Sequence, residues 1–530
     1  MKNKYFIIIL FSLLAVCGFT SCDDYLDMAP DNRTELDSKE KIQSWLVSGY
    51  PRHAFEVMTE MASDNVDHRV FPASLTYSYK NQEDCYNWDA NTDQTGNDSP
   101  YDVWVSYYEC IDIANRAIEA IDELGNSADL QPYRGEALMI RAFCHFILVN
   151  CFSYHYNEAT SDTDLGIPYL DSPNNTLNPK FNRGTVAEVY EKIDRDLQEG
   201  LPLIDDNAYT TAPKYHFNRK ASYALASRFY LYYGKWDKCI EYSNLALGTN
   251  LDKVLRNMDV FTTLVSDVQT RCREWINPAN DCNYLIMSQT TSAGTVFANY
   301  STGKLYQHSV AIALGETYRS KGPWRPTGYA SGDWYLASGA YTSGYVIYYK
   351  LPYIFEYTDP IARTGYAHSI YPAFTSDEVL LNRAEAYIIK GEYDKATDDL
   401  GKWMTGHVKN GVKLTRELIN NFYDTLSYYT PTNPTPKKEL HPLNFSITSK
   451  EQENFLHCAL HFRRIETMFY GLRWFDVKRY GIKIYRRDVS YLSSVDSVVG
   501  VTDELDIDDP RRAIQIPSDV IIAGVEENPR

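Results

Sequence analysis

Two helix–turn–helix stretches of matching sequence constrain the fold of this chain more than any other feature. Residues 219–247 and 379–403 can be laid over each other so that Gly234 falls on Gly391, with an aromatic residue two positions after each glycine. Each stretch has an apolar period of 3.6 residues on both sides of the turn, which is the pattern of a tetratricopeptide-type hairpin. We expect these hairpins to serve as a scaffold.

Three further stretches have the same apolar period: residues 112–121, 133–152 and 186–203. In the second of them the apolar side chains fall on one stripe, which is typical of a buried helix. Between the helical stretches the chain is irregular and polar. We therefore expect a mainly α fold, with long irregular loops and minor β structure, in a chain of 530 residues that can bury a large core.

The first 21 residues have the features of a secretory signal. Lys2 and Lys4 precede an apolar run over residues 5–16, which is too short to cross a bilayer core of about 30 Å as a helix. The run is followed by small residues and then Cys22, an arrangement similar to the lipobox of bacterial lipoproteins. We expect acylation of Cys22, which would hold the mature chain to a membrane without a transmembrane helix. Cleavage that leaves Cys22 unmodified is the alternative.

The charge balance excludes one class of ligand, and the aromatic content suggests another. The formal net charge is −18 and no run of Lys or Arg occurs, so the chain lacks the basic patch that binds phosphate backbones, and we expect no nucleic acid partner. The chain contains 44 Tyr, 21 Phe and 9 Trp. Tyr combines an apolar face with a hydroxyl, so this excess indicates either surfaces that bind half-polar ligands or extra Tyr in the core.

Two irregular regions, residues 77–108 and 301–374, concentrate aromatic residues among amide, carboxylate, Gly and Pro residues. Because neither region has helical spacing, we expect exposed rings on loops, which suit sugars or peptides. The candidate binding rings are Tyr86 and Trp88 in the first region and Trp324, Trp334, Tyr335 and Tyr341 in the second. The alternative for residues 345–353 is a strand and turn that bury their rings against the helices.

Catalytic motifs are absent or incomplete. His457 and His461 have the spacing of a zinc site on a helix, but Cys458 stands where a zinc hydrolase needs its Glu, so we expect both histidines in the core. Residues 89–93 resemble the start of a calcium loop, which then lacks its Gly and its final Glu. Neither a nucleophile elbow nor a phosphate loop occurs, and no carboxylate pair stands out among 70 acidic residues. We expect no catalytic residue, metal or cofactor.

Eight cysteines remain after Cys17 and Cys22 are set aside, an even number that permits disulfides in an exported protein. Cys272 and Cys282 flank a short loop and could pair. Cys144 and Cys151 would lie about 10.5 Å apart along one helix, which is too far for a disulfide. We expect these two to act as small core residues.

Eight short segments, in the same order, resemble the SusD/RagB family of outer-membrane nutrient-binding lipoproteins. They lie at residues 24–30, 135–146, 167–170, 183–190, 380–387, 463–481, 514–517 and 528–529. The sixth departs from the usual pattern, with Lys478 and Tyr480 in place of Arg and Trp. The first part of the 301–374 region matches no motif, as expected of a region that varies with the ligand.

The resemblance implies a single SusD-like domain over residues 22–530 and a role in binding. It implies a lipoprotein anchored by Cys22 on the extracellular face of the outer membrane, and Asp23 and Asp24 are similar to the surface-sorting signal of Bacteroides-like bacteria. Such a protein would act as the lid of a SusC-type TonB-dependent transporter and capture an oligosaccharide or, in some members, an oligopeptide. The helical face would contact the transporter or bury the core. A surface-anchored hydrolase and a tetratricopeptide adaptor that binds no small ligand are the alternatives.

Overall fold

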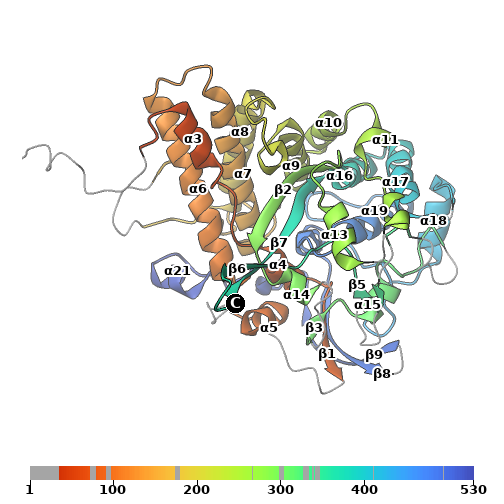
Figure 1. The fold of residues 1–530 in the computed structure, drawn as a ribbon. Coiled ribbons are helices and arrows are strands. Elements are labelled where there is room, and N and C mark those ends of the chain that lie inside the picture. The colour runs from red at the N-terminus through yellow and green to blue at the C-terminus, as the bar shows by residue number, and fades with distance from the viewer. Residues whose placement is uncertain are drawn as a thin grey trace, which may run out of the picture.

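The computed structural model describes most of the chain after the N-terminal segment. The described residues are 35–71, 79–90, 97–173, 180–264, 267–297, 304–325, 334–336, 339–340, 346–409, 411–492 and 495–530. The predicted signal peptide, Cys22 and Tyr341 lie outside these residues. Within them helices predominate and three small sheets lie among the helices, so the predicted mainly α fold with minor β structure is confirmed (Figure 1).

The longer helices form the frame of the molecule. They are α3 (Lys39–Leu46), α4 (Glu56–Ala62), α5 (Lys80–Asn87), α6 (Pro100–Glu123), α7 (Gln131–Phe152), α8 (Val186–Gly200), α9 (Arg219–Tyr232), α10 (Trp236–Leu247), α13 (Val268–Trp275), α16 (Ser376–Ile389), α17 (Tyr393–His407), α18 (Arg416–Thr425), α19 (Lys450–Glu466) and α20 (Leu472–Arg479). Short helical turns are α11 (Leu251–Val254), α12 (Val260–Thr263), α14 (Ala293–Val296), α15 (Val310–Gly315) and α21 (Ser518–Ile522), with 3₁₀ turns η1 (Leu201–Leu203), η2 (Pro213–Tyr215) and η3 (Pro510–Arg512).

The two predicted hairpins are confirmed as α9–α10 and α16–α17. Gly234 and Gly391 turn the chain between the helices of each pair with φ of 72° and 76°, a left-handed conformation that side chains other than glycine rarely adopt. Small residues bring the helices together, since Ser227 Oγ on α9 lies 2.8 Å from Ser243 Oγ on α10. Helix α10 packs in turn on α16, so the hairpins stack as repeats do.

Helix α7 is the central core helix, as its single apolar stripe predicts. It packs between α6 and α8, and nearly all its side chains from Gly135 to Phe152 are buried. Among the described helices, α7 alone is long and apolar enough to cross a membrane, and it is buried within the protein. Helix α8 begins with a capping box in which Thr185 and Glu188 bond each other's backbone N–H groups.

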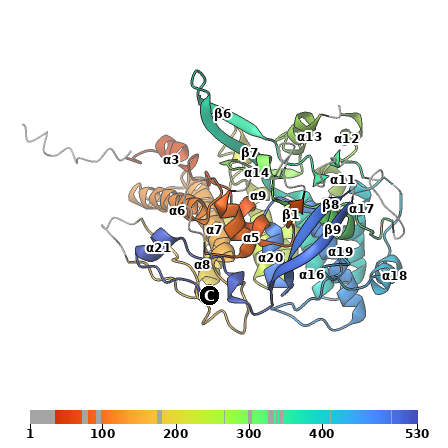
Figure 2. The same cartoon turned by 90° about the horizontal axis from the view of Figure 1, so that it is seen from below.

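Three sheets connect distant parts of the chain. Their strands are β1 (Asp67–Phe71), β2 (Asn283–Thr290), β3 (Tyr306–Gln307), β4 (Gly339–Ala340), β5 (Val346–Ile347), β6 (Ile354–Asp359), β7 (Thr364–Thr375), β8 (Ile484–Leu492) and β9 (Val495–Leu505). The orders are β3-β1-β8-β9, β2-β7-β6 and β4-β5. In Figure 2 the far end of the β6–β7 hairpin stands clear of the body, and we call this hairpin the arm.

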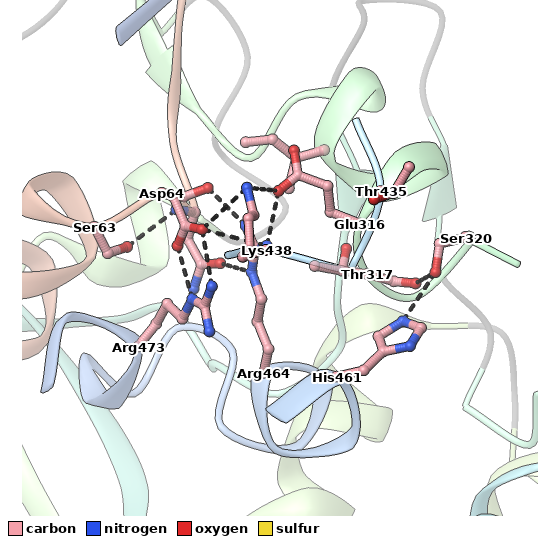
Figure 3. A network of polar contacts seen from close by, with 12 residues as sticks. Ser63, Asp64, Glu316, Thr317, Ser320, Thr435, Lys438, His461, Arg464 and Arg473 are labelled. Atoms are coloured by element: carbon pink, nitrogen blue, oxygen red, sulfur yellow. Dashed lines mark hydrogen bonds and ion pairs between the residues drawn. The ribbon is translucent and has the colours of Figure 1, made fainter. Parts of the chain in front are cut away.

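A buried ionic network joins segments from the start, middle and end of the chain (Figure 3). Arg464 Nη1 donates to Glu316 Oε2 at 2.8 Å, Lys438 Nζ lies 2.7 Å from the same oxygen, and Arg473 Nε donates to Asp64 Oδ1 at 2.7 Å. Burial alone would raise the pKa of Glu316, but Lys438 and Arg464 outweigh it and hold that pKa at about 2. Arg464 and Arg473 belong to the 463–481 motif, so this motif holds the fold together.

The described cysteines and the two spaced histidines are core residues. All eight cysteines are buried and free, so the suggested Cys272–Cys282 disulfide is absent. The Cys272 thiol instead donates to the carbonyl oxygen of Leu351 at 3.3 Å. His457 and His461 are buried on α19, and His461 Nε2 lies 2.9 Å from Ser320 Oγ, which confirms their predicted core role.

Candidate functional site: the junction of the two aromatic regions

The two aromatic regions meet where α5, from residues 77–108, packs on β3, from residues 301–374, and β1 pairs antiparallel with β3 beside this contact. His68 pairs with Tyr306, and the Tyr86 and Tyr306 rings lie 4.6 Å apart between centroids. At the edge of this contact the Lys304 ammonium lies 5.7 Å from the centroid of the Tyr79 ring. The sequence predicts the two regions separately. In the structure, Tyr79 and Tyr86 of the first region lie against Lys304 and Tyr306 of the second.

Two of the candidate rings in the first region are buried, and the expectation that they are exposed is wrong. Trp88 is 4% exposed and ends α5 with a left-handed backbone, and its indole N–H donates to the carbonyl oxygen of Ala62 at 2.8 Å. Tyr86 is 2% exposed, and its hydroxyl accepts a hydrogen bond from the backbone N–H of His68. The Arg486 guanidinium covers both rings, at 3.8 Å from Trp88 and 4.1 Å from Tyr86.

The rest of that region also differs from the prediction, because it contains two helices. Ser99 caps α6 by accepting a hydrogen bond from the backbone N–H of Asp102, and Pro100 stands at the first helical position, where its missing N–H costs nothing. Tyr101, Trp104 and Tyr108 therefore lie on a helix and not on a loop.

The expectation that the two second-region tryptophans are exposed is wrong as well. Trp324 and Trp334 are 1% and 2% exposed, and their rings meet edge to face at 5.1 Å. The neighbouring glycines do not expose them. A Cβ on Gly322 would lie 2.4 Å from the Trp324 ring, so this glycine makes room for a buried indole. Trp324 also packs on His461 at 5.0 Å.

Tyr335 is half-buried, and Tyr341 lies outside the described residues. The backbone N–H of Tyr335 donates to the carbonyl oxygen of His407 at 3.1 Å, and the Lys409 ammonium lies 5.5 Å from the centroid of its ring. Of the candidate rings that the structure describes, Tyr335 has the most accessible side chain.

Five residues lie at the meeting point of the two regions, and we call them the junction site: Tyr79, Lys304, Tyr306, His68 and Asp488. Lys304 and Tyr306 are buried, at 7% and 6% exposed, and His68 and Asp488 are half-buried. Tyr79 is 37% exposed. His68 stacks on Tyr306 at 5.2 Å, and His68 Nδ1 lies 2.8 Å from Asp488 Oδ1 on β8. Burial lowers the pKa of the Lys304 ammonium to about 8. The site thus offers a ligand the exposed Tyr79 ring, which can stack on it, and the half-buried His68 and Asp488 side chains, which can bond its hydroxyls.

The arm carries a second set of exposed rings, which the sequence reasoning did not single out. Phe355, Tyr357 and Tyr366 are 36%, 53% and 37% exposed. Gly365 lets the strands close, since a Cβ there would lie 1.9 Å from the carbonyl oxygen of Glu356. The signal in the sequence is two alternating stretches around a turn at residues 359–363.

The base of the arm adjoins the first aromatic region, residues 77–108, at α5. The backbone N–H of Thr291 donates to the carbonyl oxygen of Ala367 at 3.2 Å, and the next residue, Ser292, accepts a hydrogen bond from Gln82 on α5 at 3.4 Å. The exposed rings of the arm therefore begin close to the elements that carry the junction site.

The described residues contain no group of three or more His, Cys, Asp or Glu side chains suited to a metal ion. Residues 91–96, which include most of the incomplete calcium loop, lie outside them.

Stacked helical hairpins with small sheets among them define the SusD-like class of fold. One family model, described as SusD-like and starch-binding associating with outer membrane, matches residues 24–231, and a second, the SusD family, matches residues 292–502. The chain belongs to the SusD/RagB family. No curated protein matches it.

Solved structures from Bacteroides share the fold over almost the whole chain. A SusD superfamily protein from Bacteroides thetaiotaomicron is 18% identical with a TM-score of 0.61, over 92% of this chain and 98% of its own. A putative sugar binding protein from Bacteroides vulgatus is 18% identical with a TM-score of 0.63, over 94% and 99%. A SusD-like carbohydrate binding protein from the same species is 16% identical with a TM-score of 0.59, over 91% and 95%.

Proposed function

We propose that this protein is a cell-surface lipoprotein that binds an oligosaccharide nutrient and passes it to a SusC-type TonB-dependent transporter, for which it acts as a lid. The anchor would be an acylated Cys22 on the extracellular face of the outer membrane. Residues 22–530 would act as one domain, without chemistry on the ligand and without a cofactor.

The observation that carries the proposal is the junction site. Tyr79 presents an exposed aromatic ring beside the buried Lys304 ammonium, and the half-buried His68 and Asp488 supply polar groups next to the buried Tyr306 ring. Sugar rings have apolar faces edged by hydroxyls, so aromatic faces beside charged hydrogen-bonding groups complement them. Two of the similar solved structures carry the descriptions sugar binding and carbohydrate binding, which favours a glycan over an oligopeptide.

The test is a binding panel with product analysis. The chain from residue 22, with Cys22→Ser to remove the acylation site, is titrated with neutral oligosaccharides, acidic oligosaccharides and oligopeptides. We expect saturable binding of a neutral oligosaccharide and its recovery intact by mass spectrometry after long incubation. A shortened product would indicate the hydrolase alternative. Binding of no member of the panel would favour the adaptor alternative.

A further inference from the structure

A large groove lies on a different set of elements from the junction site. Its volume is about 1140 Å³, and it is formed by α3, α6, residues 168–170, residues 180–181 and α21. We call it the α6 groove. No residue of the junction site lines it. Five aromatic side chains do: Trp45, Tyr101, Trp104, Tyr108 and Phe181.

Three rings of the α6 groove are held in place by contacts with the surrounding protein. The indole N–H of Trp45 donates to the carbonyl oxygen of Ile113 at 3.0 Å, and the Tyr108 hydroxyl donates to the carbonyl oxygen of Pro168 at 2.7 Å. Trp104 is 6% exposed and packs edge to face on Phe152 at 5.1 Å. Because Trp45, Trp104 and Tyr108 are already ordered, a ligand in contact with these three rings would not have to immobilise them. Tyr101 and Phe181, which line the same groove, are half-buried.

Charged groups of both signs complete the lining of the groove. Arg52 and Lys180 are exposed cations, and Glu109 and Asp519 are exposed anions. A lipid chain would desolvate these groups without hydrogen bonds in return, and a polyanion would meet three carboxylates, those of Glu109, Asp112 and Asp519. A neutral polyhydroxyl chain can donate to the carboxylates and accept from the cations.

We propose that the α6 groove is a second binding groove for a neutral glycan chain, in which the sugar faces stack on Tyr101 and Phe181. This inference rests on the proposed function. One glycan long enough to reach both sites would bind more tightly than either site allows alone, since the second contact becomes intramolecular.

The experiment counts binding sites with the neutral oligosaccharide that the panel selects. Isothermal titration calorimetry compares four proteins, all with Cys22→Ser. They are the otherwise unchanged parent, the double variant Tyr101→Ala/Phe181→Ala, the junction variant Tyr79→Ala and the control Leu124→Ala. Leu124 adjoins the end of α6, is 40% exposed and does not line the groove. We expect two sites per chain in the parent and the control, one site in the double variant, and two sites in Tyr79→Ala with the junction site weakened about threefold to tenfold. If the double variant unfolds, Arg52→Gln, which changes an exposed side chain, should weaken the groove site about threefold to tenfold.

Three results would overturn the inference, and they differ from one another. The parent could have a single site that Tyr79→Ala weakens and the groove variants keep. This result would leave the proposed function intact and would exclude the groove as a binding site. Oligopeptide binding that depends on Tyr101 and Phe181, with unchanged glycan binding, assigns the groove to peptides. Absence of all glycan binding in the parent removes the proposed function and this inference with it.

Discussion

The Arg486 guanidinium lies 3.8 Å from the centroid of the Trp88 ring, so a charged group from β8 closes over an indole that the sequence suggested was exposed. Trp88→Ala should therefore lower the free energy of unfolding by about 3–5 kcal/mol, as for other buried aromatic residues. Urea denaturation measures this loss. Unchanged stability together with lost glycan affinity would mean that the ring works at the surface.

Loss of one carboxylate from the ionic network should lower the stability of the protein. Glu316→Gln would leave Lys438 and Arg464 buried beside a neutral group, and we expect a loss of about 3–5 kcal/mol in the free energy of unfolding. Glu451→Gln is the matched control, because Glu451 pairs with Arg416 at the surface, and it should cost less than about 1 kcal/mol. Equal effects of the two changes would contradict a structural role for the network.

Glu56 should make stability depend on pH. Burial raises its pKa from the usual 4.5 to about 8, so the folded protein holds this proton more firmly than the unfolded chain. Its contribution to stability is fully present below pH 4.5 and is lost as the pH rises through 8.

Glu56→Gln keeps a neutral side chain at every pH. The difference in unfolding free energy, variant minus wild type, should rise between pH 5 and pH 8 by up to about 1.4 kcal/mol per pH unit. Chemical denaturation at several pH values measures it. Glu60 and Asp98, whose pKa values burial raises to about 7 and 6, are present in both proteins, and their charges also raise the Glu56 pKa. The difference therefore reports Glu56 together with its interaction with these two carboxyls. A flat difference would contradict a protonated Glu56.

The mature chain should begin at Cys22 with acyl groups attached. Mass spectrometry of the N-terminal peptide from outer membranes should give the mass of a lipid-modified cysteine, and Cys22→Ser should release the protein from the membrane fraction. Affinity purification of the anchored form should recover a TonB-dependent transporter. An unmodified residue at the mature start would remove the anchor.

The scaffold was predictable from sequence because its signal is local. The matched glycines Gly234 and Gly391 and the apolar stripe of 133–152 act within single helices or turns, and the structure has them as expected. Whether each aromatic ring is buried or exposed was not predictable in this way. Trp324 is buried by His461, and Trp88 by Arg486, each from a segment far along the chain.

The junction site shows the same limit. Composition marks the regions that contain Tyr79 and Tyr306, but their common location depends on the packing of α5 on β3, which no local pattern specifies. The exposed rings of the arm had a local signal, because alternation on both sides of a short turn indicates a hairpin.

Titration of Tyr79→Ala with the selected oligosaccharide tests the central claim most directly. Tyr428→Ala is its control, since Tyr428, which follows α18 and is not part of the junction site, is 38% exposed against 37% for Tyr79. We expect the junction affinity to fall about threefold to tenfold in Tyr79→Ala and to stay at the wild-type value in Tyr428→Ala, with both proteins as stable as the wild type. Equal affinity in all three proteins would contradict a binding role for the junction site.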